Sequence, residues 1–184
     1  MAVIDAFRRP DPERVVREHG PEVLRLLRRV LGPGQEVEDV AQAVFIEVLR
    51  ALPRFRGKAK LKTFIHRITL NVAYQELRAR YRHRRVWADT VLEEEKVPAG
   101  SDLESEVCGR RQVELLYEAL GDLSPKKRLA VILHDLEGRS LREIAEDLGR
   151  PLPTIASQVR AGRSELAEWF ARREAHVAAR REKR

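Results

Sequence analysis

The sequence predicts an all-α protein of two small helical domains joined by an acidic, flexible linker, the second domain containing a helix-turn-helix. Hydrophobic residues make up 43% and charged residues 35% of the 184 positions, whereas aromatic residues make up only 5%. Leu, Ala, Arg and Glu, which favour helices, are abundant. No run of alternating β-branched residues is bounded by turn residues, so no strand is expected.

Charge divides the chain into three parts. Residues 1–85 hold 19 basic and 10 acidic residues, residues 86–108 hold 1 and 7, and residues 109–184 hold 16 and 12. The middle part also contains Pro98 and Gly100, and this composition is typical of a linker. It is either a solvated spacer or an anionic segment that occupies a basic channel in a partner or shields the basic domains.

The first domain is expected to hold three helices, because apolar residues recur at helical spacing in three stretches. The turn at residues 32–34 ends the first helix and Pro53 ends the second. The apolar positions are Val23, Leu26, Leu27, Val30 and Leu31; then Val37, Val40, Ala41, Val44, Phe45, Val48, Leu49 and Leu52; then Leu61, Phe64, Ile65, Ile68, Val72 and Leu77.

The second domain is expected to hold four helices. The first covers residues 103–120, and Ser124 with Pro125 begins the next. Ser140 and Glu143 have the spacing of a capping box. The helices 140–148 and 154–166 would form a helix-turn-helix, a geometry that presents its second helix to the major groove. The apolar positions of this domain are Val107, Val113, Leu116, Leu120, Leu129, Ile132, Leu133, Leu136, Leu141, Ile144, Ala145, Leu148, Ile155, Val159, Gly162 and Leu166. The last helix is expected to end near residues 169–170, before a frayed basic tail.

Composition argues against several other classes of protein. A single cysteine, Cys108, excludes an internal disulfide framework and a cysteine-cluster zinc site. The histidines show no metal-ligand spacing; they are His19, His66, His83, His134 and His176. Neither a signal peptide nor 18 consecutive apolar residues is found. We therefore expect a cytoplasmic protein that is not an enzyme, with no catalytic residue, cofactor, metal or membrane insertion.

A basic and aromatic stretch at residues 53–85 favours nucleic-acid binding, as does the net charge of +7. The stretch has 11 basic residues and one acidic residue. Basic groups neutralise phosphates, and aromatic rings stack on exposed bases, so the mixture suits single strands. Alternatively, Phe55 and Phe64 belong to the core and the arginines form a solvated face. The interleaved rings are Phe55, Phe64, His66, Tyr74 and Tyr81.

Two parts of the sequence resemble conserved regions of bacterial sigma factors of the extracytoplasmic-function (ECF) class. Residues 36–78 are similar to the second region, through Asp39, Gln42 and Phe45 and through ALPRFRG at 51–57 followed by TF at 63–64 and Asn71. Residues 124–170 are similar to the fourth region. There the shared motifs are LSP at 123–125, LEGRS at 136–140, IA at 144–145, LG at 148–149 and Thr154.

The resemblance implies a promoter-specificity subunit that binds core RNA polymerase through its clamp and flap. It also implies recognition of the −10 and −35 promoter elements, capture of a flipped base, and an anti-sigma factor as a further partner. The residues carried over by position are Glu38, Asp39, Gln42, Phe45 and Glu47 for polymerase; Arg56, Lys62, Thr63, His66, Arg67 and Asn71 for the −10 element and melting; and Arg139, Thr154, Ser157, Gln158, Arg160 and Arg163 for the −35 element.

The sequence departs from the family pattern in both regions. Ala43 stands where an acidic residue is usual, and Ala156, Gln158 and Ala161 stand where basic residues are common. Weak or unusual −35 binding is therefore expected. This leaves a second interpretation, a sigma-like interaction module that binds polymerase or an anti-sigma factor. A third, an ordinary helix-turn-helix regulator, leaves the 53–85 stretch unexplained.

Overall fold

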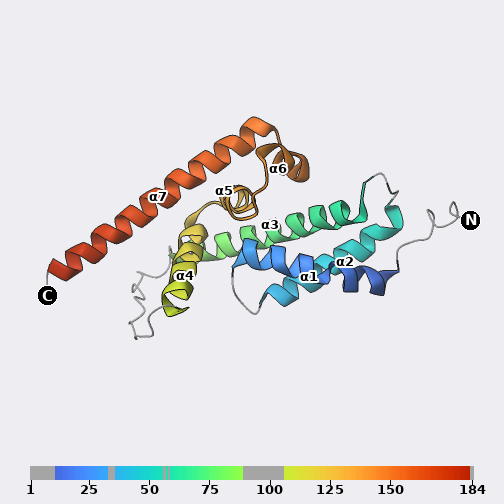
Figure 1. Cartoon of the computed structure of the whole chain (residues 1–184), viewed down its shortest axis with the longest axis horizontal. Coiled ribbons are helices and arrows are strands. Elements are labelled where there is room, and N and C mark those ends of the chain that lie inside the picture. Colours follow the sequence, from blue (N-terminus) through green and yellow to red (C-terminus); the bar gives the residue numbers. More distant parts are fainter. Residues whose placement is uncertain (1–10, 33–35, 56, 58, 89–105, 183–184) are drawn as a thin grey trace, which may run out of the picture. The chain divides into compact units, whose positions relative to one another are not determined.

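The computed structural model describes residues 11–32, 36–55, 57, 59–88 and 106–182, and within them every regular element is a helix (Figure 1). The chain divides into two compact units, Met1–Glu76 and Leu77–Arg184. The division falls inside a helix, α3 (Leu61–Ala88), nine residues before the charge boundary at residue 85. The acidic segment predicted as a linker lies mostly at residues 89–105, outside the described residues.

The N-terminal unit contains α1 (Pro12–Leu31), α2 (Glu36–Ala51), the short 3-10 helix η2 (Leu52–Arg54) and the first part of α3. Asp11 caps α1 by accepting a hydrogen bond from the Glu13 N–H at 3.3 Å, and Pro12 occupies the first turn. At the other end Gly32 has φ 95°, a left-handed value that glycine adopts readily. These signals fix where α1 begins and ends.

The core of the N-terminal unit confirms the predicted apolar stripes of α1 and α2 with two exceptions. Phe45 is half-buried and Leu49 is 36% exposed. All the other predicted positions on these two helices are buried. The two helices pack against each other, as their complementary stripes require.

The predicted stripe of α3 is fully buried at only two of its six positions. Leu61, Phe64, Ile68 and Val72 are only half-buried, whereas Ile65 and Leu77 are buried as expected. The other buried positions are Thr69, Leu70 and Ala73. Thr69 can be buried because its hydroxyl donates a hydrogen bond to the Ile65 carbonyl at 2.9 Å. The core face of α3 therefore includes a threonine with a locally satisfied hydroxyl and a small alanine beside Leu70, which apolar spacing alone did not indicate.

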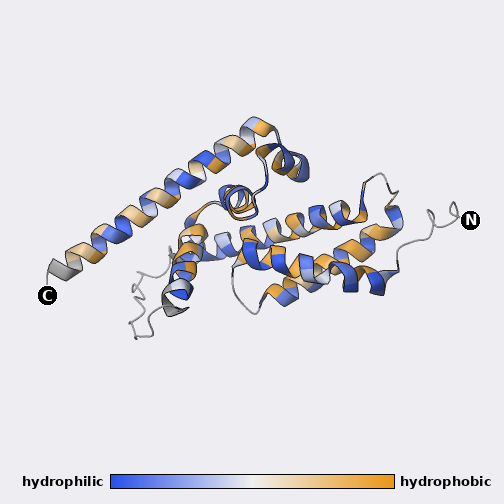
Figure 2. Ribbon diagram, viewed as in Figure 1, coloured by the Kyte–Doolittle hydropathy of each residue, from blue (hydrophilic) through white to orange (hydrophobic). Residues whose placement is uncertain are grey.

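The C-terminal unit contains the end of α3, then α4 (Glu106–Asp122), α5 (Pro125–Val131), the π-helical turn η3 (Ile132–Leu136), α6 (Leu141–Leu148) and α7 (Leu152–Glu182). Its core is formed by Leu120, Leu129, Ile132, Leu133, Ile144, Ile155 and Val159. Gly162 allows α5 and α7 to approach closely, because a Cβ there would lie 2.6 Å from Val131 Cγ2. Figure 2 shows α6 as mostly hydrophilic, in agreement with the exposure of most of its polar residues.

The C-terminal unit differs from the prediction in the end of its last helix and in the burial of two apolar residues. The last helix continues to Glu182 instead of ending near residues 169–170, so the tail to that point is helical. No proline or glycine follows Gly162, and the Ala, Arg and Glu of the tail are good helix formers. Val113 and Leu136, expected on the core side, are 47% and 42% exposed. Leu136 leaves the core at the π-helical turn, which changes the direction of its side chain.

Candidate nucleic-acid and protein interfaces

The outward face of α2 combines exposed polar and apolar side chains. Gln42, Ile46 and Leu49 follow one another at i, i+4 and i+7, which places them on one strip of the helix. Ile46 is 50% exposed, and Asp39 lies exposed beside the strip, together with Ala43. Ile46 was not among the residues predicted from the sequence, and Leu49 was predicted to lie in the core. The available signal was an isoleucine lying off the buried stripe of a regular amphipathic helix.

Three of the residues predicted to face polymerase have contacts within the unit. Glu38 accepts a hydrogen bond from Arg28 of α1, with Nη2 2.9 Å from Oε1. This bond holds the pKa of the Glu38 carboxyl below its ordinary value. Glu47 pairs with Arg50 one turn later at 2.7 Å, and Phe45 is half-buried. Asp39 and Gln42 are therefore the exposed members of the predicted set that lie beside the apolar strip.

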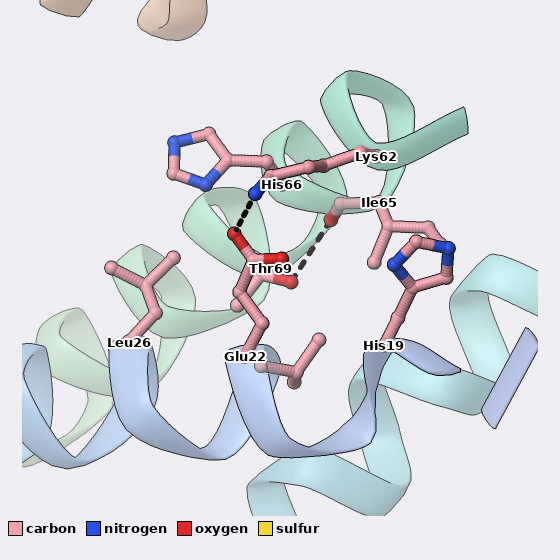
Figure 3. A pocket seen from close by; sticks show the side chains of 8 residues that line it. His19, Glu22, Leu26, Lys62, Ile65, His66 and Thr69 are labelled. Carbon is pink, nitrogen blue, oxygen red and sulfur yellow. Dashed lines mark hydrogen bonds and ion pairs between the residues drawn. The ribbon is translucent and has the colours of Figure 1, made fainter. Parts of the chain in front are cut away.

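The polar residues predicted for the −10 element form two neighbouring strips on α3. Thr63, Arg67 and Asn71 lie at i, i+4 and i+8, and Arg67 and Asn71 are exposed. Lys62 and His66 face α1 instead, where they line a pocket with His19 and Glu22 (Figure 3). There Lys62 Nζ lies 2.8 Å from Glu22 Oε1. Arg56 lies outside the described residues.

The aromatic residues of the basic stretch are largely occupied by neighbours. The rings of Phe55 and Phe64 lie 5.0 Å apart and pack on each other, and both are half-buried and not fully enclosed in the core. Tyr81 lies in the C-terminal unit, with the Arg85 guanidinium 5.9 Å from its ring centre. Base stacking by Phe55 or Phe64 would therefore require these two rings to separate.

The end of the basic stretch contributes to packing in the C-terminal unit. Arg84 Nη1 lies 3.2 Å from Asp122 Oδ1, and the indole N–H of Trp169 donates to the other oxygen of Asp122 at 2.8 Å. Arg128 is buried. Burial, reinforced by the charges of Arg84 and Arg80, lowers its pKa to about 10. Some of these arginines therefore have structural roles besides any contact with phosphate.

The helix-turn-helix is formed by α6, the turn at residues 149–151 and the start of α7. The predicted capping box is present: the Ser140 N–H donates to Glu143 Oε2 at 2.9 Å, and the Glu143 N–H donates to Ser140 Oγ at 3.3 Å. Gly149 ends α6 with φ 60°, as a left-handed cap requires. The backbone geometry of the motif therefore agrees with its sequence signals.

The open face of α7 is sparsely charged. Ser157, Arg160 and Ser164 are exposed at successive turns, and Arg160 has no ion pair within the described part of the chain. Thr154 is half-buried, and its carbonyl accepts a hydrogen bond from the Ser157 hydroxyl at 2.9 Å. Gln158 is half-buried, and its Oε1 atom is enclosed without a hydrogen-bond partner among the described residues.

Two further arginines predicted for the −35 element are held by carboxylates. Arg139 Nη2 lies 2.6 Å from Oδ2 of Asp147, whose side chain is 9% exposed. Arg163 forms a two-pronged pair with Asp135, in which Nε lies 3.0 Å from Oδ2 and Nη2 donates to Oδ1. This pair raises the pKa of the Arg163 guanidinium above its ordinary value. Arg160 is thus the predicted −35 cation that the fold presents outward without an internal carboxylate.

Comparison with known proteins agrees with the arrangement of the two units. Residues 15–83 match the Sigma-70 region 2 family, and residues 113–166 match the Sigma-70 region 4 family. The chain is 32% identical over 152 residues to the RNA polymerase sigma-H factor of Pseudomonas aeruginosa, covering 79% of this chain and 78% of that one. The chain belongs to the ECF class of RNA polymerase sigma factors.

Two other relatives of this sigma factor extend the comparison. It is 32% identical over 171 residues to the ECF sigma factor SigE of Mycolicibacterium smegmatis, covering 92% of this chain but only 65% of that protein. Among solved structures, the sigma factor RpoE of Bartonella quintana, in complex with the anti-sigma factor NepR, has a similar fold, with a TM-score of 0.57 at 23% identity. That match covers 86% of this chain and 96% of the other.

The family match defines the two regions in terms of the helices. Region 2 takes in most of α1, all of α2 and most of α3, whereas region 4 extends from within α4 to residue 166 of α7. The last sixteen residues of α7 lie beyond the match. No described helix has the length and apolar character needed to cross a membrane.

Proposed function

We propose that this chain binds core RNA polymerase and directs it to promoters, where it recognises the −10 and −35 elements and helps to open the duplex. The observation that carries the proposal is the outward face of α2, where Ile46 and Leu49 lie exposed beside Asp39 and Gln42. Apolar side chains grouped with polar ones on an exposed helix face are typical of a protein interface. In a region 2 fold, this surface suits the polymerase clamp.

The exposed strip of α3 supplies the second part of the mechanism. Arg67 can contact phosphate, and Asn71 can hydrogen-bond to a base edge, because both project from successive turns of a rigid helix. Unstacking a base costs a few kcal/mol per step. Contacts that form only with an unstacked base would offset that cost. Opening the promoter therefore needs binding energy and no bond chemistry, and the protein acts as a binding subunit and not as an enzyme.

Region 4 would place α7 against the −35 duplex. Arg160 is directed outward for a phosphate contact, and Ser157 lies one turn before it on the same exposed face. The predicted partners are core RNA polymerase, through its clamp and flap, and promoter DNA, with an anti-sigma factor as a regulator. The solved relative bound to NepR supports the last of these. The site of action would be the cytoplasm.

The alternative interaction module is favoured by one specific observation. Arg139, just before α6, and Arg163 of α7 are both held by carboxylates, which leaves Arg160 as the predicted −35 arginine without an ion pair among the described residues. In this case the chain would bind polymerase or an anti-sigma factor without directing transcription alone. The two proposals differ in what happens after core polymerase is bound.

Transcription from genomic DNA separates the two proposals. Purified protein is mixed with core RNA polymerase and fragmented genomic DNA, and the starts of the run-off transcripts are mapped. A working sigma factor yields starts that share −10-like and −35-like sequences at a constant spacing. Stable binding to core polymerase with no transcripts would reject promoter recognition and leave the interaction module.

A further inference from the structure

Arg163 of the helix-turn-helix forms an ion pair with Asp135, which lies before the motif in the chain. The π-helical turn η3 includes Asp135, and Arg163 lies 28 residues later on α7. Both carboxylate oxygens are engaged, one by Nε at 3.0 Å and the other by Nη2. A two-pronged pair of this kind fixes the plane and direction of the guanidinium. Arg163 is therefore oriented toward Asp135 in the absence of DNA.

The pair remains accessible to solvent. The Arg163 side chain is 55% exposed and the Asp135 side chain is 28% exposed. Exposed ion pairs contribute little net stability, because water solvates both partners well when they separate. A DNA phosphate, which offers the same kind of charged oxygen, can therefore compete with Asp135 for this guanidinium.

The second arginine pair of the motif differs in burial. Asp147, which pairs with Arg139, has a side chain that is only 9% exposed. Separating that pair would take an arginine away from a nearly buried carboxylate, so the pair behaves as part of the scaffold. The Asp135 pair lacks this constraint and can exchange partners.

We propose that Asp135 sets the affinity of region 4 for duplex DNA by holding Arg163 in an internal pair that a phosphate must displace. This inference rests on the proposed contact between α7 and the −35 duplex. A helix with alanines at positions 156 and 161 would thereby have an additional arginine, which becomes available to DNA when the pair with Asp135 opens. Asp135 thus acts as a positioning residue for Arg163 and does not itself contact DNA.

Salt dependence of duplex binding tests the proposal. The full chain is titrated into a fluorescein-labelled duplex of mixed sequence over about 50 to 200 mM NaCl, a range in which counterion release dominates affinity. Asp135→Asn is expected to bind roughly three- to tenfold more tightly at about 0.1 M salt, and to steepen the slope of log affinity against log salt by about 0.9, as one added phosphate contact predicts. In an Arg163→Ala background the same change is expected to have no effect.

Glu146→Gln is the matched control, because Glu146 is an exposed carboxylate on α6 with no part in the pair. Its effect on binding is expected to be the same with and without Arg163. Arg163→Lys supplies a second test, since lysine keeps the charge but cannot form the two-pronged pair. It is expected to bind duplex at least as tightly as the wild type. Circular dichroism and thermal melting confirm that each variant is folded.

The outcomes separate this inference from the proposed function. A gain that persists without Arg163 would show simple repulsion between Asp135 and DNA and would overturn the inference. Unchanged duplex binding by both Asp135→Asn and Arg163→Lys would also overturn the inference, and this includes the case in which no variant binds duplex. If promoter-specific transcripts are still made in that case, the proposed function stands alone. Tighter binding that depends on Arg163, without transcripts, would support the inference and reject promoter recognition.

Discussion

Lys62 of α3 forms an ion pair with Glu22 of α1, with Nζ 2.8 Å from Oε1 (Figure 3). One of the cations predicted to contact the −10 strand is therefore already paired with a carboxylate. The Lys62 side chain is 66% exposed and that of Glu22 is 44% exposed, so the pair is weak and open to competition from phosphate.

The first prediction is that Glu22→Gln strengthens binding to single-stranded DNA at low salt. Lys62 would lose its internal partner, and the salt slope is expected to steepen by at most about 0.7, the value for one contact with a single strand. Glu18→Gln is the matched control, because Glu18 pairs with Arg14 on the same helix. Equal gains from both substitutions would show that only the net charge matters.

The second prediction concerns the apolar strip of α2. Ile46→Asp is expected to weaken binding to core polymerase by about tenfold or more, because full burial of such a side chain is worth about 1.5–3 kcal/mol and Ile46 is half-exposed before binding. Val113→Asp places the same charge on an equally exposed apolar site of α4 and should leave core binding unchanged. Fluorescence titration with labelled core polymerase measures both. A similar loss from both variants would exclude a specific role for α2.

The third prediction concerns the capping box of α6. Ser140→Ala is expected to lower the free energy of unfolding by about 1 kcal/mol, since the N-terminal amides lose a hydrogen-bond acceptor. Ser164→Ala, which removes an exposed hydroxyl bonded only to Glu168 among the described residues, should have almost no effect. Urea unfolding followed by circular dichroism compares them. If Ser164→Ala were as destabilising, loss of the cap would not be the cause.

The stability that the same capping box contributes is expected to depend on pH through the Glu143 carboxyl. Hydrogen bonds from Ser140 hold the pKa of its carboxyl below the ordinary value of 4.5. A lowered pKa in the folded state means that this contribution to stability is complete above pH 4.5 and is lost as the pH falls through the lowered pKa. Stability measured from pH 7 down to pH 3 should therefore fall less steeply in Glu143→Gln than in the wild type. Identical pH profiles would contradict the assignment.

The fourth prediction separates two arginines that sequence alone placed together. Arg160→Ala should weaken duplex binding and reduce the salt slope by about 0.9 without affecting stability, because Arg160 has no ion pair within the described ranges. Arg139→Ala should instead destabilise the fold by about 1–3 kcal/mol, since it leaves the poorly exposed Asp147 without this arginine. Thermal melting and duplex titration of both variants check the distinction. A stability loss from Arg160→Ala would contradict it.

Local signals explain which parts of the fold could be predicted from the sequence. The stripe of α1 and the Ser140–Glu143 capping box depend on residues a few positions apart, and both were predicted correctly. The core face of α3 was misread because Thr69 satisfies its hydroxyl on the Ile65 carbonyl, which hydropathy does not register. The length of α7 was underestimated because the exposed tail lacks an apolar stripe and is helical through its composition.

The candidate sites were less predictable, because their availability depends on tertiary partners. Sequence motifs indicated Arg163 as a DNA contact, but Asp135 lies 28 positions away and only the fold brings the two together. The same holds for Lys62 and Glu22, which come from different helices. Ile46 lies off the buried stripe of α2, so the sequence carried a signal for its exposure, but its grouping with Leu49 and Asp39 on one surface is seen only in the fold.

In the proposed mechanism, α2 binds polymerase while the exposed strip of α3 opens the promoter. This mechanism is tested most directly by comparing core binding with promoter melting in a variant carrying both Arg67→Ala and Asn71→Ala. These side chains are exposed, so the fold should be preserved, and Arg25→Ala on α1 serves as the control for loss of an exposed arginine.

Melting is measured by the permanganate reactivity of unpaired thymines on a promoter found by run-off mapping, and core binding is measured by fluorescence titration. The α3 variant is expected to bind core polymerase like the wild type but to form at least tenfold fewer open complexes, whereas Arg25→Ala is expected to behave like the wild type in both assays. Parallel losses of core binding and melting, or undiminished melting, would contradict this mechanism.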